Sequence, residues 1–244
     1  MDARGVTFAP ASGRQVWTLI DMFPGRPGMT VIGENGGIVM RDGVEVSSSP
    51  LDAPTMREAV RLVREATSGP DGIDGGLVMC GKQFAYVERT DDRFVDGVLP
   101  YYHRTKRIDD QIAIIDAIEA GEIDDAIVKL AVYVIGPVQT LAEATLARFA
   151  DTHQYAVSGA NWADLQIRGV DKGSAVRDLQ RFLGVDRSQT AVFGDAGNDL
   201  SMMSEGDLSF AMANASRDVV EAARFVAPSN NEAGVAQVLR ALLG

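Results

Sequence analysis

The chain has 244 residues and a formal net charge of −11, with 46% hydrophobic and 23% charged residues. This length suffices for one large or two modest domains, and the composition is ordinary for a soluble globular protein. The acidic balance argues against a nucleic-acid-binding protein, because neutralising phosphates requires clustered Lys and Arg. It does not exclude a small anionic substrate, since one local cation or metal can hold such a ligand.

The sequence shows no sign of membrane insertion or export. No apolar run approaches the ~20 residues that a membrane-spanning helix needs. The N-terminus also lacks the charged and then apolar pattern of a signal peptide. The single cysteine, Cys80, excludes an internal disulfide and fits a reducing compartment. We therefore predict a cytoplasmic protein in which Cys80 is a small core residue, because free cysteine is usually buried.

The first fifty residues alternate apolar runs with turn signals. A short strand is expected at residues 6–9, followed after the small-residue turn at 12–13 by an amphipathic helix. Residues 31–32 are typical of a further strand. Residues 36–46 predict a hairpin that turns at Asp-Gly, residues 42–43, a strong two-residue turn signal.

The middle of the chain has a different pattern. A helix is expected at residues 55–65, and two strands with a tight turn near residues 81–82. An apolar strand at 126–135 is followed by an expected helix at 138–150. Because these elements do not alternate regularly, residues 51–168 are interpreted as an inserted α+β domain.

From residue 169 onward, helices and strands alternate strictly. A helix with one apolar face ends at Gly184, a typical C-terminal stop. Strands at 190–195 and 208–213 follow, each leading into a helix, and a last helix is expected at 234–243. This alternation predicts an α/β fold with a parallel sheet.

The two patterns together predict two domains. The discontinuous core domain would comprise residues 1–50 and 169–244, and the inserted domain residues 51–168.

Two carboxylates and an amide directly follow the strand at 190–195, namely Asp195, Asn198 and Asp199. The strand and the helix before it each span roughly 15–20 Å. The chain therefore returns to the edge at which Lys172 opens the helix. Carboxyl edges of parallel strands are where α/β sheets bind ligands.

Ser12 and Gly13 follow the same rule, because they connect an expected strand to a helix where backbone N–H groups can take a phosphate. We expect an anion site at Ser12, a cation at Lys172 and a metal site at Asp195 and Asp199, all on one rim. Oxygen ligands without His or Cys favour Mg²⁺ over zinc. Lys and Mg²⁺ around an anion are what phosphoryl transfer requires, because its catalysis is mostly positioning and charge neutralisation.

Each element alone also has a simpler structural interpretation. The Ser12-Gly13 segment is an ordinary strand-to-helix turn, and Lys172 is typical of a solvated helix start. Asn35, in the segment "ENGG", is typical of a turn residue in the left-handed conformation. The functional prediction depends on all the sites occurring in one order.

That order resembles the haloacid dehalogenase (HAD) superfamily of Mg²⁺-dependent phosphatases, specifically its Cof-type branch, subfamily IIB. The matching segments are "ASGR", "GENGG", "VDKGSAV", "GDAGNDLSMM", "FAMANA" and "SNNEAGVAQVL", which cover most of the expected core. The pair "DKG" and "GDxxND", about twenty residues apart, is the specific part. The resemblance implies a HAD-like Rossmannoid parallel-sheet core with an inserted α+β cap, which matches only in layout.

The resemblance implies a role for each matching residue. Ser12 and Lys172 would be catalytic, with Ser12 binding the phosphoryl group and Lys172 stabilising its charge. Asp195 and Asp199 would position Mg²⁺. The expected substrate-binding residues are Ser12, Gly13, Asn35, Lys172 and Asn198.

One element of the family is missing. In the family the metal faces an Asp-x-Asp-Gly-Thr motif, whose first Asp is the nucleophile and whose second Asp is the general acid and base. The 244 residues contain no such motif, and the nearest imitation, "DGIDGG" at residues 71–76, has the wrong spacing and is expected to be a loop. Because the start resembles a helix end entering a strand, Met1 is interpreted as an internal Met of a longer protein that lacks its first, central strand here. A genuinely shortened, inactive relative is the alternative.

The resemblance favours a phosphomonoester hydrolase acting on small phosphorylated metabolites such as sugar phosphates, without nucleic-acid or membrane partners. The alternative is a non-catalytic protein that binds phosphate esters. A mutase is less expected, because such relatives carry small helical caps. In the cap, Asn161 and Trp162 are candidates for either substrate contact or packing, and Arg104 for either a phosphate-facing cation or a surface residue.

Overall fold

The computed structural model describes residues 4–26 and 29–244. It confirms the expected mixed α/β class, and the chain divides into two compact units, Met1–Val170 and Asp171–Gly244. Residues up to 50 thus share a unit with the middle segment, and their assignment to a core domain with residues 169–244 stays a prediction. The interpretation of Met1 concerns a residue outside the described ranges.

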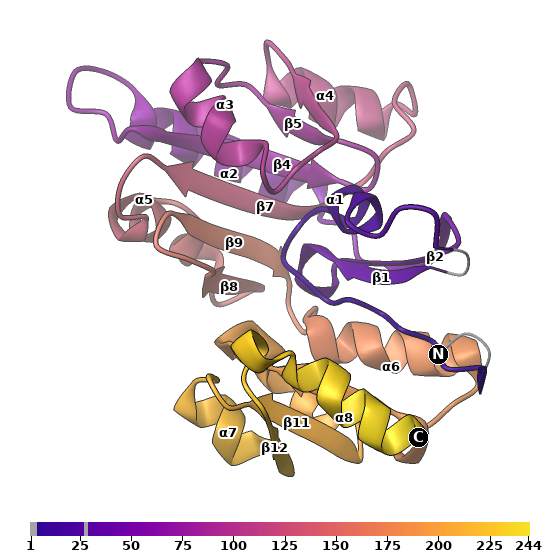
Figure 1. The fold of residues 1–244 in the computed structure, drawn as a ribbon. Coiled ribbons are helices and arrows are strands. Elements are labelled where there is room, and N and C mark those ends of the chain that lie inside the picture. The colour runs from indigo at the N-terminus through magenta and orange to yellow at the C-terminus, as the bar shows by residue number, and fades with distance from the viewer. Residues whose placement is uncertain (1–3, 27–28) are drawn as a thin grey trace. The chain divides into compact units, whose positions relative to one another are not determined.

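The first unit contains a six-stranded sheet in the order β6-β5-β4-β7-β9-β8, whose strands other than β6 are labelled in Figure 1. Neighbouring strands are antiparallel except β5 and β6, which are parallel. Its strands are β4 (Gly75–Gly81), β5 (Ala85–Val87), β6 (Thr105–Arg107), β7 (Ile127–Val134), β8 (His153–Val157) and β9 (Trp162–Ile167).

Helices cover both faces of this sheet, because successive strand residues point to opposite faces and both sets are apolar. Leu77 and Met79 of β4 face α2, α4 and α5, whereas Val78 and Cys80 face α3. Cys80 is fully buried, as predicted. The helices are α2 (Ala53–Thr67), α3 (Asp92–Val98), α4 (Gln111–Glu119) and α5 (Gln139–Ala144).

The helix predicted at 138–150 is interrupted. After α5 the chain continues as a 3-10 turn, Leu146–Phe149. The break lies at Thr145, whose hydroxyl donates to the carbonyl of Leu141 over 2.6 Å. Such a hydroxyl competes with the backbone for the same acceptor and often bends or ends a helix.

A second, three-stranded antiparallel sheet in this unit comprises β1 (Thr30–Gly33), β2 (Ile38–Arg41) and β3 (Val44–Ser48). The predicted hairpin turn is confirmed, since Asp42 and Gly43 both adopt positive φ, 52° and 76°. The short helix α1 (Val16–Asp21) packs on this sheet through Val16 and Leu19.

The strand predicted at residues 6–9 is wrong. Ala11 instead forms a single parallel bridge with Ile32, supported by the carbonyl of Pro10, which accepts from the N–H of Ile32 over 2.8 Å. Pro10 accepts but cannot donate, because proline has no backbone N–H, and this limits the ladder to a short contact.

The second unit alternates helix and strand, as predicted. Its parallel sheet has the order β10-β11-β12, of which Figure 1 labels β11 and β12, and the third strand was not predicted. The segment after β10 is a 3-10 helix, η5, and α6 ends at Gly184 with φ 67°. The elements are α6 (Lys172–Leu183), β10 (Ala191–Gly194), η5 (Gly197–Ser204), β11 (Leu208–Met212), α7 (Arg217–Ala222), β12 (Phe225–Ala227) and α8 (Gly234–Leu243).

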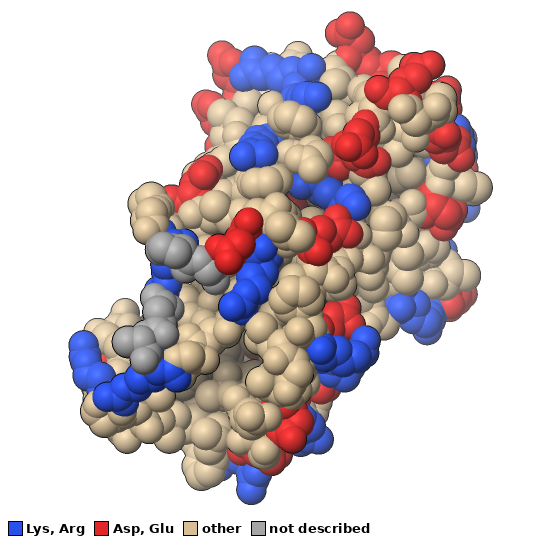
Figure 2. Space-filling model, turned by 90° about the vertical axis from the view of Figure 1, so that its right-hand side faces the viewer, with Lys and Arg blue, Asp and Glu red and all other residues tan. Residues whose placement is uncertain are grey.

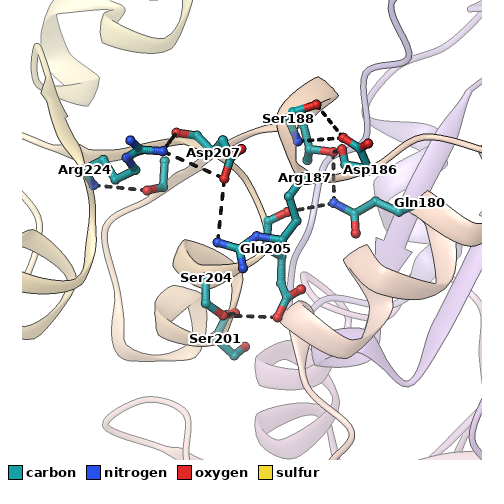
Figure 3. Close-up of polar contacts among 11 residues, drawn as sticks. Gln180, Asp186, Arg187, Ser188, Ser201, Ser204, Glu205, Asp207 and Arg224 are labelled. Atoms are coloured by element: carbon teal, nitrogen blue, oxygen red, sulfur yellow. Dashed lines mark hydrogen bonds and ion pairs between the residues drawn. The ribbon is translucent and has the colours of Figure 1, made fainter.

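A polar network ties together the chain at the N-terminal ends of β10 and β11 (Figure 3). Gln180 of α6 donates to the carbonyl of Glu205 over 2.7 Å, and Asp207 lies 3.8 Å from both Arg187 and Arg224. These side chains satisfy one another, so this end of the sheet is held by structural contacts. Asp195 directly follows the opposite, carboxyl end of β10.

Charged side chains of both signs are interspersed on the face drawn in Figure 2. On α2, the exposed Arg61 forms surface ion pairs with Glu58 and Glu65. Within the described residues, no helix has both the length and the apolar character to cross a membrane.

Candidate functional site

Lys172 and Asp199 form a buried ion pair in the second unit. The Nζ atom of Lys172 lies 2.6 Å from Oδ1 of Asp199, and the two side chains are only 6% and 9% exposed. The other oxygen of Asp199 accepts hydrogen bonds from the N–H groups of Asp195 and Ala196, over 3.0 and 3.1 Å. A charge is tolerated in such a position only when it is paired and hydrogen-bonded. Lys172 is therefore not the solvated helix-start residue of the simpler interpretation.

The local sequence explains how these two residues meet. Asp171 caps α6 by accepting the N–H of Ser174 over 2.7 Å, which fixes Lys172 in the first turn. A Cβ atom on Gly173 would lie 2.5 Å from the carbonyl oxygen of Ser201. Only glycine permits this approach of η5 to the helix start.

Asp195 lies at the carboxyl end of β10 and is partly exposed. Its Oδ2 atom accepts from the side-chain amide of Asn214 over 3.2 Å, and Asn214 in turn accepts from the N–H of Asn230 over 3.0 Å. Asn198 lies on the exposed side of η5.

The two carboxylates differ in what they offer a metal ion. Among residues 4–26 and 29–244, no group of three or more His, Cys, Asp or Glu side chains is gathered as a metal site. Mg²⁺ is usually held by one or two carboxylates, with water and substrate phosphate completing its shell. Asp195 fits that description, whereas Asp199 would have to exchange an existing partner.

In the first unit, the structure brings Ser12, Gly13 and Asn35 together. The N–H of Ser12 donates to the carbonyl of Ile32, and its carbonyl accepts from the N–H of Asn35, each over 3.0 Å. Its hydroxyl accepts from the N–H of Arg14 over 3.2 Å. Asn35 adopts the predicted left-handed conformation, with φ 52°. The prediction that Ser12 shares one rim with Lys172 stays a prediction.

A buried ionic cluster next to this loop was missed by sequence analysis. Lys129 of β7 lies 2.7 Å from Glu34, with both side chains 1% exposed, and 3.8 Å from Asp164 of β9. The signal that could have revealed it is a lysine in the middle of the apolar strand "AIVKLAVYVI".

The cluster shifts the pKa values of its members. Burial raises the pKa of Glu34, and Lys129 offsets part of that effect. For Lys129, burial acts to lower the pKa, but the carboxylates of Asp164 and Glu34 outweigh it and raise the pKa. The charged form of Lys129 is therefore held firmly inside the protein.

Three residues that the sequence analysis singled out in the middle of the chain have structural partners. The Arg104 guanidinium lies 3.5 Å from the ring centre of Trp17. Asn161 donates to the carbonyls of Val134 and Gly136, over 3.2 and 2.7 Å. Trp162 packs against several tyrosine rings and remains partly exposed.

A family model for haloacid dehalogenase-like hydrolases matches residues 1–239. The chain is also similar to the 5-amino-6-(5-phospho-D-ribitylamino)uracil phosphatase YbjI of Escherichia coli (strain K12). The two are 32% identical over 246 residues, which cover 100% of this chain and 85% of that protein.

Solved structures share the fold. A crystal structure from Eubacterium rectale has a TM-score of 0.80 at 22% identity and covers 99% of this chain and 87% of that one. The structure of the HAD subclass IIB sugar phosphatase BT4131 has a TM-score of 0.72 at 17% identity. The match covers 99% of this chain and 87% of that one. At these identities the likeness concerns the fold alone.

Proposed function

Because the chain belongs to the haloacid dehalogenase-like hydrolase family, we propose that it is a Mg²⁺-dependent phosphatase that hydrolyses a small phosphorylated metabolite. The observation that carries this proposal is the buried ion pair of Lys172 and Asp199, which is hydrogen-bonded to the backbone of the partly exposed Asp195. A lysine ammonium and a carboxylate that can bind Mg²⁺, both at the carboxyl end of a strand, would neutralise the phosphate charge as phosphoryl transfer requires.

Each residue has a defined part in the proposed reaction. The ammonium of Lys172 has three N–H donors, of which Asp199 accepts one, so two remain for phosphoryl oxygens. The hydroxyl of Ser12 accepts from Arg14 and keeps its own hydrogen for a phosphoryl oxygen. Asp195 would hold Mg²⁺, which neutralises phosphate charge when bound. None of these residues is assigned as the nucleophile.

For the substrate, we propose the phosphate ester of a sugar alcohol that also carries a planar ring. The substrate in the name of the similar Escherichia coli phosphatase belongs to this class. The exposed ring of Tyr101 supports this class. It lies 5.3 Å from the Trp162 ring and 4.7 Å from the Arg14 guanidinium, and the backbone N–H of Arg14 donates to the hydroxyl of Ser12. Aromatic side chains bind planar rings by stacking. A simple sugar phosphate is the competing class.

A second candidate function is a protein that binds phosphate esters without turning them over. It is favoured by one observation, the absence of an Asp-x-Asp-Gly-Thr segment from the 244 residues. Loss of a nucleophile typically lowers the rate on the order of a millionfold.

The two candidates are separated by hydrolysis of p-nitrophenyl phosphate with and without Mg²⁺. A phosphatase gives Mg²⁺-dependent turnover that Asp195→Asn abolishes. Asp207→Asn is the matched control, because Asp207 lies at the other end of the sheet among Arg187 and Arg224. Turnover that survives in Asp195→Asn contradicts the assignment of Asp195. Mg²⁺-dependent turnover by the unaltered chain contradicts the second candidate.

A further inference from the structure

Lys129 is a charged residue in a strand that is otherwise apolar. It lies in β7 between the buried residues Val128 and Leu130 and is itself 1% exposed. Replacing a buried ion pair by apolar side chains is often neutral or stabilising. Burial of β7 alone therefore gives no reason for a lysine at this position.

Lys129 contacts the two segments that contain Ser12 and Asn35. Its Nζ atom donates to the carbonyl oxygen of Gly13 over 2.8 Å and lies 2.7 Å from Oε2 of Glu34. Gly13 follows Ser12, and Glu34 precedes Asn35. One ammonium thus reaches both of the segments that carry the proposed phosphate-binding residues.

The same cluster reaches the side chain of Asn35. Asp164, 3.8 Å from Lys129, accepts a hydrogen bond from the Asn35 amide over 3.0 Å. Gln166, two residues further along β9, donates to the carbonyl of Glu34 over 2.8 Å. The turn at Glu34 and Asn35 is therefore held by side chains from the six-stranded sheet.

The backbone of this turn needs such support. Glu34 and Asn35 both adopt positive φ, 50° and 52°, which is unfavourable for residues with a side chain. Such a conformation persists only where surrounding contacts determine it.

We propose that Lys129 is a positioning residue for the phosphate site. Its ammonium holds Gly13 in place directly, and it holds Asn35 in place through Glu34 and Asp164. This inference rests on the proposed function for its purpose. Lys129 does not need to touch the substrate. Its ammonium aligns the Ser12-Gly13 segment with the Asn35 turn before a phosphate ester binds.

Hydrogen–deuterium exchange tests the positioning without any ligand. The reporting amides are those of Ser12, Glu34 and Asn35, which donate to Ile32, Arg14 and Ser12 respectively. In Lys129→Met we expect at least tenfold faster exchange at these amides, with α2 amides unchanged. The matched control is Val132→Ala, a buried residue of the same strand that packs in the cluster containing α2, and it should leave the loop amides protected.

A second variant covers the case in which Lys129→Met does not fold. Asp164→Ala removes the acceptor for the side-chain amide of Asn35 but leaves the contact of Lys129 with Gly13. Faster exchange is therefore expected at the backbone amide of Asn35 and not at that of Ser12. Unchanged exchange at all three amides in a folded Lys129→Met protein, or at Asn35 in Asp164→Ala, would overturn the proposal.

A ligand measurement connects the positioning to function. With p-nitrophenyl phosphate and Mg²⁺, Lys129→Met should raise KM, or Kd if there is no turnover, at least tenfold, whereas Val132→Ala changes it less than twofold. If the unaltered protein neither binds nor hydrolyses the ester, the proposed function fails while the exchange result still decides the role of Lys129.

Discussion

The Nζ atom of Lys172 and the Oδ1 atom of Asp199 lie 2.6 Å apart, and neither side chain is more than 9% exposed. This pair joins the first turn of α6 to the segment that follows β10. It orients the lysine and also fixes the backbone of Asp195 and Ala196 through the second oxygen of Asp199. In the proposed function, this pair would prepare the geometry in which a phosphate and a metal ion are held.

Loss of one partner should be costly. In Lys172→Met the Asp199 carboxylate stays buried without its cation, and such a change typically costs about 3–5 kcal/mol. We expect the unfolding free energy of the second unit, measured by hydrogen exchange of β11 amides, to fall by about this amount. Lys172→Arg, which keeps the charge, should lose less. A loss below about 1 kcal/mol in Lys172→Met would contradict a buried pair.

The pKa of Glu34 gives a prediction for pH. Burial raises this pKa above its ordinary 4.5, so the folded protein binds a proton that the unfolded chain has lost. The contribution of Glu34 to stability is therefore full below pH 4.5 and decreases as pH rises through the folded pKa. Glu34→Gln removes this dependence.

Urea unfolding between pH 4.5 and 8 checks this sign. We expect the unfolding free energy of Glu34→Gln, relative to that of the unaltered protein, to increase with pH. Equal pH slopes for the two proteins would show that Glu34 has no raised pKa.

The start of α2 offers a test of local structure that is independent of function. The carboxylate of Asp52 accepts from the N–H and the hydroxyl of Thr55, each over 2.9 Å. Asp52→Ala should destabilise the first unit by about 1 kcal/mol, the usual contribution of such a cap. Asp52→Asn, which still caps, should lose much less, as measured by urea unfolding. Equal losses in the two variants would contradict the capping role.

Tyr101 should affect the choice of substrate more than the chemistry. If its exposed ring stacks on a planar leaving group, Tyr101→Leu should lower the preference for a ring-bearing phosphate ester over glucose 6-phosphate by about tenfold, or ~1.4 kcal/mol. Tyr101→Phe should keep the preference. The measurement is the ratio of kcat/KM values, or of Kd values in the absence of turnover. An unchanged ratio in Tyr101→Leu would favour a ring-independent substrate.

Sequence reasoning was successful where a local signal determines the structure. The end of α6 at Gly184 and the hairpin turn at Asp42 and Gly43 depend on backbone conformations that few residues adopt, so both could be predicted. The short strand β12 has only three residues, Phe225–Ala227, and depends on pairing with β11. Such non-local pairing leaves little trace in the local pattern.

The candidate site shows the same limit. The motif around Asp195 is contiguous in sequence, so its acidic residues could be singled out. The contacts of Lys129 join residues far apart in the chain, Gly13, Glu34 and Asp164, and no spacing rule connects them. The sequence indicated candidate residues for the chemistry, and the structure was needed to show which contacts position them.

Calorimetric titration of p-nitrophenyl phosphate, with and without Mg²⁺, into the unaltered chain and Asp195→Asn tests the central claim most directly. Both proposed functions require a phosphate ester to bind more tightly with Mg²⁺ than without it, and require Asp195→Asn to lose that difference. Asp207→Asn should bind as the unaltered chain does. Absence of binding under all conditions, or an equal Mg²⁺ effect in Asp195→Asn, would contradict the account.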